Sequence, residues 1–232
     1  MDLSTTTAFV TGANRGLGRH FAEQLLARGA TVYAGARNPA PVDLSGAIPV
    51  AIDVTDPASV AAAAAATSGV TLLINNAGSG TGASVLTGSI DDIRLEMETH
   101  YFGALDVTRA FAPQLAANGG GAVLNVLSVL SWFTAPHVSA YSAAKSAAWS
   151  LTNALRIELA GQRTVVSALH VGYMDTDMAR DVTGPKSDPA VIAKIALDGV
   201  EAGSTEILAD ELSRNVQAGL AGGVSALYPQ VA

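Results

Sequence analysis

The stretch TTAFVTGANRGLG, residues 6–18, decides the fold of this 232-residue chain. Its opening part, Thr6–Val10, is β-branched and apolar, which predicts a buried strand. The next segment, Thr11–Gly18, places three glycines within eight residues, and helical periodicity follows over Gly16–Arg28. A strand, a glycine-rich turn and a helix in this order bring backbone N–H groups and a helix N-terminus towards an anion. The turn therefore predicts a phosphate-binding loop, unless its glycines serve only to pack the helix closely on the sheet.

Strand-like and helical segments alternate along the rest of the chain. The expected strands are Thr6–Val10, Thr31–Gly35, Ile48–Ile52, Thr71–Asn75, Ala122–Leu127, Val165–His170 and Glu206–Ala209. The expected helices are Gly16–Arg28, Pro57–Thr67, Ile90–Ala117, Ser139–Ala160, Asp188–Ala202 and Glu211–Leu220. Asp56-Pro57 and Asp188-Pro189 are both typical of an N-cap followed by proline at the first helical position. The alternation predicts right-handed βαβ units in one domain, residues 1–232. Its core would be a doubly wound, Rossmann-type parallel sheet of about seven strands with helices on both faces.

The composition excludes several classes of protein. Lys and Arg total 13, Asp and Glu total 20, and the net charge of −7 comes without a basic cluster, so neither nucleic acid nor anionic membrane is expected as a partner. Cysteine is absent, which excludes disulfides and a thiol nucleophile, and we expect no metal site. Charged residues make up 14% of the chain, and so few charges predict a homodimer or homotetramer. Neither a signal peptide nor a membrane span is recognisable, so we expect a cytoplasmic location.

The end of the second expected strand indicates which dinucleotide the glycine turn would bind. A site for NAD carries an Asp or Glu there for the ribose 2′-hydroxyl, whereas NADP requires cations for the 2′-phosphate. The strand instead runs into Gly35-Ala36-Arg37, and Arg15 lies inside the glycine turn. Two arginines converging on one phosphate favour NADP(H), although each alone could be an ordinary solvated surface residue.

A second motif, YSAAK at residues 141–145, places Tyr141 and Lys145 four residues apart on one helix face. A phenol with a pKa near ~10 is a poor acid–base catalyst at neutral pH, and a neighbouring ammonium favours its ionised form. Ser128 lies at the carboxyl end of an expected strand, where its hydroxyl could hold a carbonyl oxygen. Together the three groups are suited to orient, polarise and protonate one C–O centre. The Tyr–Lys spacing alone is a weak signal, but with Ser128 and the glycine turn it becomes strong.

With these motifs the chain resembles the short-chain dehydrogenase/reductase family over nearly its whole length. The matching segments are Thr11–Gly18, Asp53-Val54, Asn75–Gly78, Ser128, Tyr141 with Lys145, and residues 171–176. The resemblance implies that Tyr141 donates the proton in reduction, that Lys145 binds the nicotinamide ribose, and that Ser128 orients the substrate. We expect a cofactor half of about residues 1–120 and a catalytic and substrate half of about 121–232.

The expected cofactor-binding residues combine the motifs with the resemblance. They are Gly12, Asn14, Arg15, Gly16, Leu17, Gly18, Arg37, Asp53, Val54, Asn75, Ala77, Gly78, Tyr141, Lys145, Gly172, Met174 and Thr176. The resemblance implies that Asp53 and Val54 contact the adenine and that Asn75–Gly78 line the cofactor cleft. It also implies that Gly172, Met174 and Thr176 fix the nicotinamide carboxamide.

Two positions depart from the family pattern. Where the family usually has Asn in the long helix Ile90–Ala117, this chain has His100, which we count among the catalytic candidates. In the family that Asn helps to hold a water that joins the lysine to a proton relay, and an imidazole, which titrates near neutral pH, can also donate and accept. His100 could equally be packed at a helix interface and satisfied locally, and both interpretations stay open. Val171 stands where the family usually has proline.

The expected substrate-facing residues flank these motifs. They are Ser79, Ser128, Trp132, Phe133, Val138 and Tyr173. The pair Trp132 and Phe133 indicates an apolar pocket, although a buried pair that fills the core is an equally ordinary interpretation. The segment Asp177–Pro189 contains Gly184-Pro185 and could form a small mobile lid.

Three functions are compatible with this constellation. The leading hypothesis is NADPH-dependent reduction of a ketone or aldehyde to an alcohol, reversible as an alcohol dehydrogenase. The second is a non-catalytic NADP sensor or regulatory protein of the same fold, but such proteins commonly lose the Tyr or Lys that this chain retains. The third is reduction of a conjugated C=C bond, whose families usually space Tyr and Lys differently.

Overall fold

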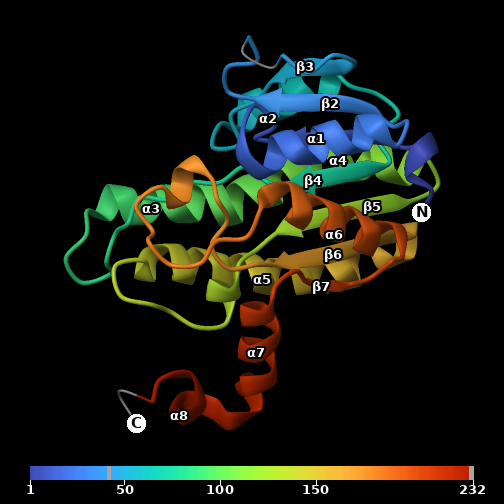
Figure 1. The fold of residues 1–232 in the computed structure, drawn as a ribbon. Coiled ribbons are helices and arrows are strands. Elements are labelled where there is room, and N and C mark those ends of the chain that lie inside the picture. The colour runs from blue at the N-terminus through green and yellow to red at the C-terminus, as the bar shows by residue number, and fades with distance from the viewer. Residues whose placement is uncertain (41–42, 230–232) are drawn as a thin grey trace.

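One parallel sheet runs through the computed structural model, which describes residues 1–40 and 43–229 (Figure 1). Its seven strands lie in the order β3-β2-β1-β4-β5-β6-β7. Their bounds are β1 (Thr7–Thr11), β2 (Thr31–Ala36), β3 (Ala47–Ala51), β4 (Leu72–Asn75), β5 (Gly121–Val126), β6 (Thr164–His170) and β7 (Glu206–Leu208). The strand order reverses between β1 and β4, and in such sheets ligands bind beyond the carboxyl ends of the strands at this point. The expected Rossmann-type fold is therefore confirmed.

Helices cover both faces of the sheet. They are α1 (Gly16–Ala27), α2 (Pro57–Ala65), α3 (Ile90–Met97), α4 (Gly103–Ala117), α5 (Ser139–Glu158), α6 (Pro189–Glu201), α7 (Glu211–Gly219) and α8 (Gly223–Leu227). Two of them begin as the Asp-Pro pairs predict, because the Asp56 carboxylate accepts from the N–H of Ala58 at 2.9 Å and Asp188 from that of Ala190 at 2.7 Å. These caps satisfy N–H groups that a helix start leaves without a partner.

The core is divided by the sheet into two layers. Successive side chains of a strand point to opposite faces. In β1, Val10 therefore packs with α1 and α6, whereas Phe9 packs with α2, α4 and α5. The ring centroids of Phe9 and Phe111 of α4 lie 4.6 Å apart. Because both faces of β1 are covered, Ala8, Phe9 and Val10 are all fully buried, as is usual for a central parallel strand.

The long helix expected over Ile90–Ala117 is interrupted in its middle. Residues Glu98–Phe102 form a π-helical turn between α3 and α4, in which the N–H of Gly103 donates to the carbonyl of Glu98 five residues earlier. A side chain at Gly103 would press on Val54, since its Cβ would lie 3.0 Å from the Val54 carbonyl oxygen. The turn contains His100, and π turns inside helices are frequent at functional sites. Helical periodicity alone does not reveal a single inserted residue, which is why the sequence predicts an unbroken helix.

The C-terminal helices α7 and α8 extend away from the sheet (Figure 1). The residue after α8 contacts the segment between β5 and α5, where the N–H of Thr134 donates to the Tyr228 hydroxyl at 2.8 Å. The sequence analysis expects α7 but not the five-residue α8. Within the described residues, no helix has the length and apolar character needed to cross a membrane. Nor do three or more His, Asp or Glu side chains gather in that part of the chain as a metal site would require.

Candidate active site

The glycine turn lies between β1 and α1 at the carboxyl edge of the sheet. Gly12 and Gly16 have φ values of +68° and +53°, a region that suits glycine. A Cβ at Gly18 would overlap the carbonyl oxygen of Gly12, so the start of α1 lies directly against the turn. The Thr11 hydroxyl accepts from the N–H groups of Asn76 and Ala77 at 2.9 and 3.0 Å, which joins the end of β1 to the end of β4. The turn is thus tied to the end of β4 and lies directly against the start of α1.

The start of α1 meets the requirements of a pyrophosphate site. Unlike α2 and α6, it has no side chain that caps its first N–H groups, and its N-cap residue is Arg15. Uncapped N–H groups and the helix dipole favour an anion at this point. The residues therefore fit the pyrophosphate of a dinucleotide, with Gly12, Gly16 and Gly18 leaving room for the backbone to approach it.

The two arginines expected at a 2′-phosphate lie in different surroundings. Arg37 is exposed and follows β2 directly. Arg15 forms an ion pair with Asp177, Nη1 to Oδ2 at 3.2 Å, and both side chains are largely exposed. Convergence of the two arginines on one phosphate stays a prediction, and in this structure Arg15 is paired with Asp177. Asp177 lies 162 residues away in sequence, so no local pattern indicates the pair.

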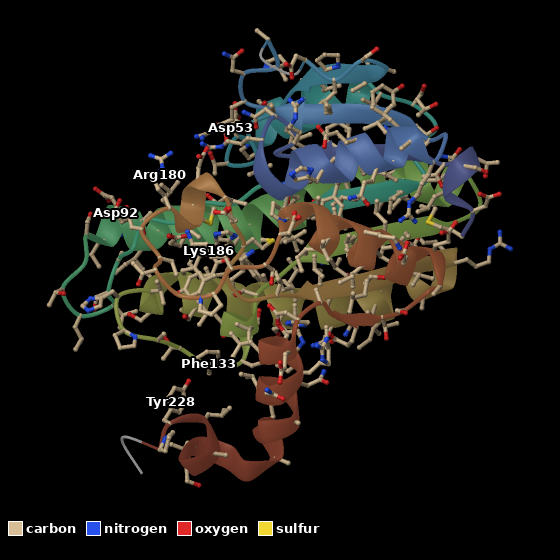
Figure 2. The ribbon with its side chains drawn as sticks, in the orientation of Figure 1. Asp53, Asp92, Phe133, Arg180, Lys186 and Tyr228 are labelled. Atoms are coloured by element: carbon tan, nitrogen blue, oxygen red, sulfur yellow. The ribbon has the colours of Figure 1, made fainter. Side chains whose placement is uncertain are left out.

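The adenine-side candidates Asp53 and Val54 follow β3. The Asp53 carboxylate accepts from the N–H and the hydroxyl of Thr55 at 3.0 and 2.8 Å. The N–H of Thr55 leads the influences that lower the pKa of Asp53, and the nearby charge of Arg37 contributes too. The side chain lies at the rim of the carboxyl edge (Figure 2).

Three of the four expected catalytic side chains come from the end of β5 and from α5. Ser128 follows β5, and Tyr141 and Lys145 lie one turn apart on α5. Lys145 is 5% exposed, its Nζ donates to the carbonyl oxygen of Val126 at 2.7 Å, and it lies 5.5 Å from the centroid of the Tyr141 ring. The Ser128 hydroxyl lies near enough to Tyr141 to favour the ionised form of the phenol. The structure therefore brings Ser128, Tyr141 and Lys145 together.

Burial has the largest effect on the pKa values of Tyr141 and Lys145. It raises the pKa of Tyr141 above that of a free phenol, and the negative charge of Glu96 adds to the rise, while the nearby Ser128 hydroxyl opposes it. Burial also lowers the pKa of Lys145 to about 8, against the opposing effect of Glu96. The sequence analysis expects Lys145 to lower the pKa of the tyrosine, whereas in this structure desolvation of the phenol raises that pKa.

His100 and Glu96 form a buried pair beside Tyr141. His100 is 4% exposed, and its Nε2 lies 2.9 Å from the carbonyl oxygen of Ser79 and 3.2 Å from Oε2 of Glu96. Its ring meets the Tyr141 ring edge to face, with centroids 5.0 Å apart. Each of the two interpretations of His100 therefore has some support. The ring is hydrogen-bonded locally, as a packed histidine would be, and it also contacts Tyr141, the candidate proton donor. The sequence analysis missed Glu96, although its spacing of four residues from His100 on one helix is a usable signal.

A small cavity of about 20 Å³ lies behind Lys145, the volume of about one water molecule. His100, Asn75 and Asn125 are among the residues that line it. The Asn75 amide donates to the Thr108 hydroxyl at 3.0 Å and to Asn125 Oδ1 at 2.9 Å, whereas its own Oδ1 has no protein partner. The expected cofactor-cleft residue Asn75 is therefore part of a buried polar network beneath the site.

The expected carboxamide segment is held by two other parts of the chain. The N–H of Gly172 donates to Asp210 Oδ2 at 2.6 Å, so this N–H is already used within the protein. Asp210 also accepts from Ser213 at the start of α7, which fixes the C-terminal helices relative to the segment. Met174 pairs with Ser187 through an isolated parallel bridge, and Thr176 Cγ2 faces Gly16 of the glycine turn.

The substrate-side candidates divide into packed and accessible residues. The Trp132 ring stacks on buried His170 with centroids 3.8 Å apart and meets Trp149 edge to face, so Trp132 fills the layer behind Ser128. The Ser79 hydroxyl donates to Glu96 at 2.8 Å and is also engaged. Tyr173 is 42% exposed, and Phe133 and Val138 are half-buried. Figure 2 shows Phe133 and Tyr228 on one side of the site, with Lys186 and Arg180 on the loop across from them.

Comparison with known proteins agrees with this geometry. The model of the short chain dehydrogenase family matches residues 6–186. Among curated proteins, mouse "Dehydrogenase/reductase SDR family member 7B" is 31% identical over 194 residues, which cover 76% of this chain and 60% of the mouse protein. The chain thus spans about 60% of that relative's length.

Solved structures extend the comparison over the full fold. A short chain dehydrogenase from Burkholderia cenocepacia in complex with NADP is 39% identical, with a TM-score of 0.95 and coverage of 100% of this chain and 99% of the other. A 3-ketoacyl-(acyl-carrier-protein) reductase from Brucella melitensis complexed with NADH is 26% identical, with a TM-score of 0.82 and coverage of 89% and 96%. A Rossmann-type sheet with a glycine cradle and a buried Tyr–Lys pair defines a dinucleotide-dependent oxidoreductase. This chain belongs to the short-chain dehydrogenase/reductase family.

Proposed function

We propose that the protein uses NADPH to reduce a ketone or aldehyde to an alcohol, and that it catalyses the reverse oxidation. The observation that carries the proposal is the convergence of Ser128, Tyr141 and Lys145 at the carboxyl end of β5, beside the turn that fits a pyrophosphate. A hydroxyl, a phenol and an ammonium in one buried group are suited to carbonyl chemistry.

The roles follow from the position of each side chain. Ser128 would hold the carbonyl oxygen, and Tyr141 would transfer its phenolic proton to that oxygen as the C–O bond is reduced. Lys145, anchored on Val126, would orient the cofactor ribose and keep a positive charge near the phenol. The bound dinucleotide would supply the hydride to the carbonyl carbon.

The preference for NADPH rests on Arg15, on Arg37 and on the lack of a carboxylate at the end of β2. The Burkholderia relative in complex with NADP supports it, whereas the Brucella relative complexed with NADH shows that the fold accepts both dinucleotides. Equal kcat/KM for NADPH and NADH would refute the assignment of the two arginines to the 2′-phosphate.

The accessible side chains favour a substrate with apolar groups. Tyr173 and Met178 are 42% and 55% exposed, and Phe133 is half-buried. We infer that these residues, together with Val138, contact the substrate around Ser128, while Trp132 supports the pocket from behind.

Replacement of Tyr141 by Phe tests the proposal directly. We expect turnover of a panel of ketones and aldehydes to fall by at least about a hundredfold, while NADPH binding, followed by fluorescence, is retained. Tyr101→Phe removes a phenol from the neighbouring π turn and serves as the control. Full activity of Tyr141→Phe would overturn the mechanism.

The same assays separate the two alternatives. Wild-type protein that binds NADPH but turns over no carbonyl would favour a sensor. Reduction of a conjugated C=C bond with the carbonyl left intact would favour the third hypothesis.

We also propose that two or four copies associate. A groove between α4 and α5 is lined by Leu105, Pro113 and Leu155, and Ile157 is 80% exposed beside it on α5. Apolar area of this kind is typical of an interface. Light scattering that finds only single chains would refute the proposal.

A further inference from the structure

Two opposite charges are buried at the candidate active site. Among the described residues, Glu96 is the only Asp or Glu below a tenth of its full exposure, and Lys145 is the only such Lys or Arg. They come from α3 and α5, which pack against each other. An isolated buried charge is costly, and charges of opposite sign placed in the same low-dielectric site offset one another.

Glu96 is held in one orientation by three groups. Its Oε2 accepts from the Ser79 hydroxyl at 2.8 Å, its Oε1 accepts from the N–H of Thr81 at 2.6 Å, and Oε2 lies 3.2 Å from Nε2 of His100. Burial alone would raise the pKa of Glu96, but the bonds from His100, Thr81 and Ser79 outweigh it and lower the pKa to about 2. The side chain is therefore a permanent anion at every pH at which the protein would work.

The contacts of His100 select one tautomer. Nε2 lies 2.9 Å from the Ser79 carbonyl oxygen and 3.2 Å from Oε2 of Glu96, which are both acceptors, and 3.3 Å from the backbone nitrogen of Ser79, which is a donor. The two acceptors are the nearer groups, so they favour a proton on this nitrogen. Burial, followed by the charge of Lys145, lowers the pKa of His100, so the ring is neutral near pH 7. Nδ1 is then an acceptor, and it is buried without a protein partner. The residue lines the same small cavity as Lys145.

We propose that Glu96 is a positioning residue of the active site: it holds His100 with Nε2 protonated and Nδ1 free to accept, and it balances the charge of Lys145. The activity test of this inference rests on the proposed function. The Ser79 hydroxyl belongs to the same arrangement, since it orients Glu96 and is not free for a substrate.

The groups around Glu96 and His100 determine in which direction the pKa values should change when Glu96 is replaced. His100 comes from the π turn, Tyr141 and Lys145 come from α5, and Tyr173 follows β6 near Tyr141. The segment that carries Ser79 and Thr81 contributes no charge. Arg94 on α3 is exposed and lies 3.6 Å from Asp91. Loss of the Glu96 charge therefore lowers the pKa of His100, Tyr141 and Lys145 alike.

The activity test compares Glu96→Gln with Glu98→Gln, which removes the same charge from an exposed position two residues away. In alcohol oxidation, we expect the acidic limb of the kcat/KM profile to move to lower pH by about half a unit or more in Glu96→Gln only. A profile that keeps its midpoints and loses only amplitude would overturn the inference. Addition of His100→Asn should reduce the effect of Glu96→Gln, since the two substitutions then share one interaction.

A second measurement does not depend on turnover, and it is made on the wild-type protein. The chain contains four histidines, so nitrogen-15 spectra of the wild-type protein can resolve each ring, and His100→Asn assigns the signal. At pH 7 we expect a protonated Nε2 and an unprotonated Nδ1. An Nδ1–H tautomer or an imidazolium would overturn the inference even if Tyr141→Phe behaves as proposed, so the two proposals can fail separately.

Discussion

The ammonium of Lys145 donates to the main-chain carbonyl of Val126, the last residue of β5, at 2.7 Å. The lysine is thus fixed to the sheet and not only to its own helix. This bond places its charge beside Tyr141 and at the edge of the cavity it shares with His100.

Because Lys145 is buried, the free energy of unfolding should depend on pH in the alkaline range. Its pKa is lowered to about 8 in the folded protein, against an unfolded value near ~10.4, so the unfolded chain binds more protons between these values and the free energy of unfolding rises with pH. We expect the wild type to gain about 2 kcal/mol relative to Lys145→Met between pH 7 and pH 9.5, while the variant loses turnover. Urea unfolding at the two pH values measures the difference. An unchanged difference would mean that the lysine is not desolvated.

Glu96 should give a dependence of the same sign at acidic pH, where the free energy of unfolding again rises with pH. Its pKa is lowered to about 2, so its contribution to stability is present above about 4.5 and is lost as pH falls towards 2. Between pH 6 and pH 3 the wild type should lose about 1–2 kcal/mol more than Glu96→Gln does. Equal losses in urea unfolding at both pH values would contradict a buried, hydrogen-bonded carboxylate.

Release of Arg15 should favour the phosphorylated cofactor. Asp177→Asn removes the anion that now holds Arg15 at 3.2 Å, so we expect the KM for NADPH to fall about two- to fivefold while that for NADH is unchanged. Asp181→Asn, which removes an equally exposed charge from the same loop, is the matched control. A parallel change for both cofactors would show that Arg15 does not contact the 2′-phosphate.

Gly78 should tolerate no side chain as long as His100 is present. A Cβ there would lie 2.9 Å from Cε1 of His100, so Gly78→Ala must displace the ring, at a cost of about 1–3 kcal/mol in unfolding free energy and a marked loss of kcat. Gly184→Ala, where a Cβ would contact nothing, is the control. In a His100→Ala background the cost of Gly78→Ala should largely disappear; if it persists, the clash lies elsewhere.

Local patterns were sufficient for most of the architecture. The strand and helix bounds agree with the expected ones to within one or two residues except along Ile90–Ala117, because apolar continuity, Asp-Pro caps and glycine turns act over a few neighbouring residues. The sequence did not predict the π turn at Glu98–Phe102, because one extra residue barely changes the helical pattern. The sequence did not predict α8 either, because five residues are too few to show a helical period.

The amino-acid sequence alone determined the parallel sheet, the glycine turn and the pairing of Tyr141 with Lys145, because each depends on spacing along one strand, turn or helix. Only the tertiary structure decided that Arg15 meets Asp177, that Trp132 packs on His170, and that Glu96 and Lys145 share one buried site. Burial and contact between distant segments arise when α3, α5 and the carboxyl edge of the sheet pack together. Desolvation then sets the charge states of the site, and no local spacing encodes it.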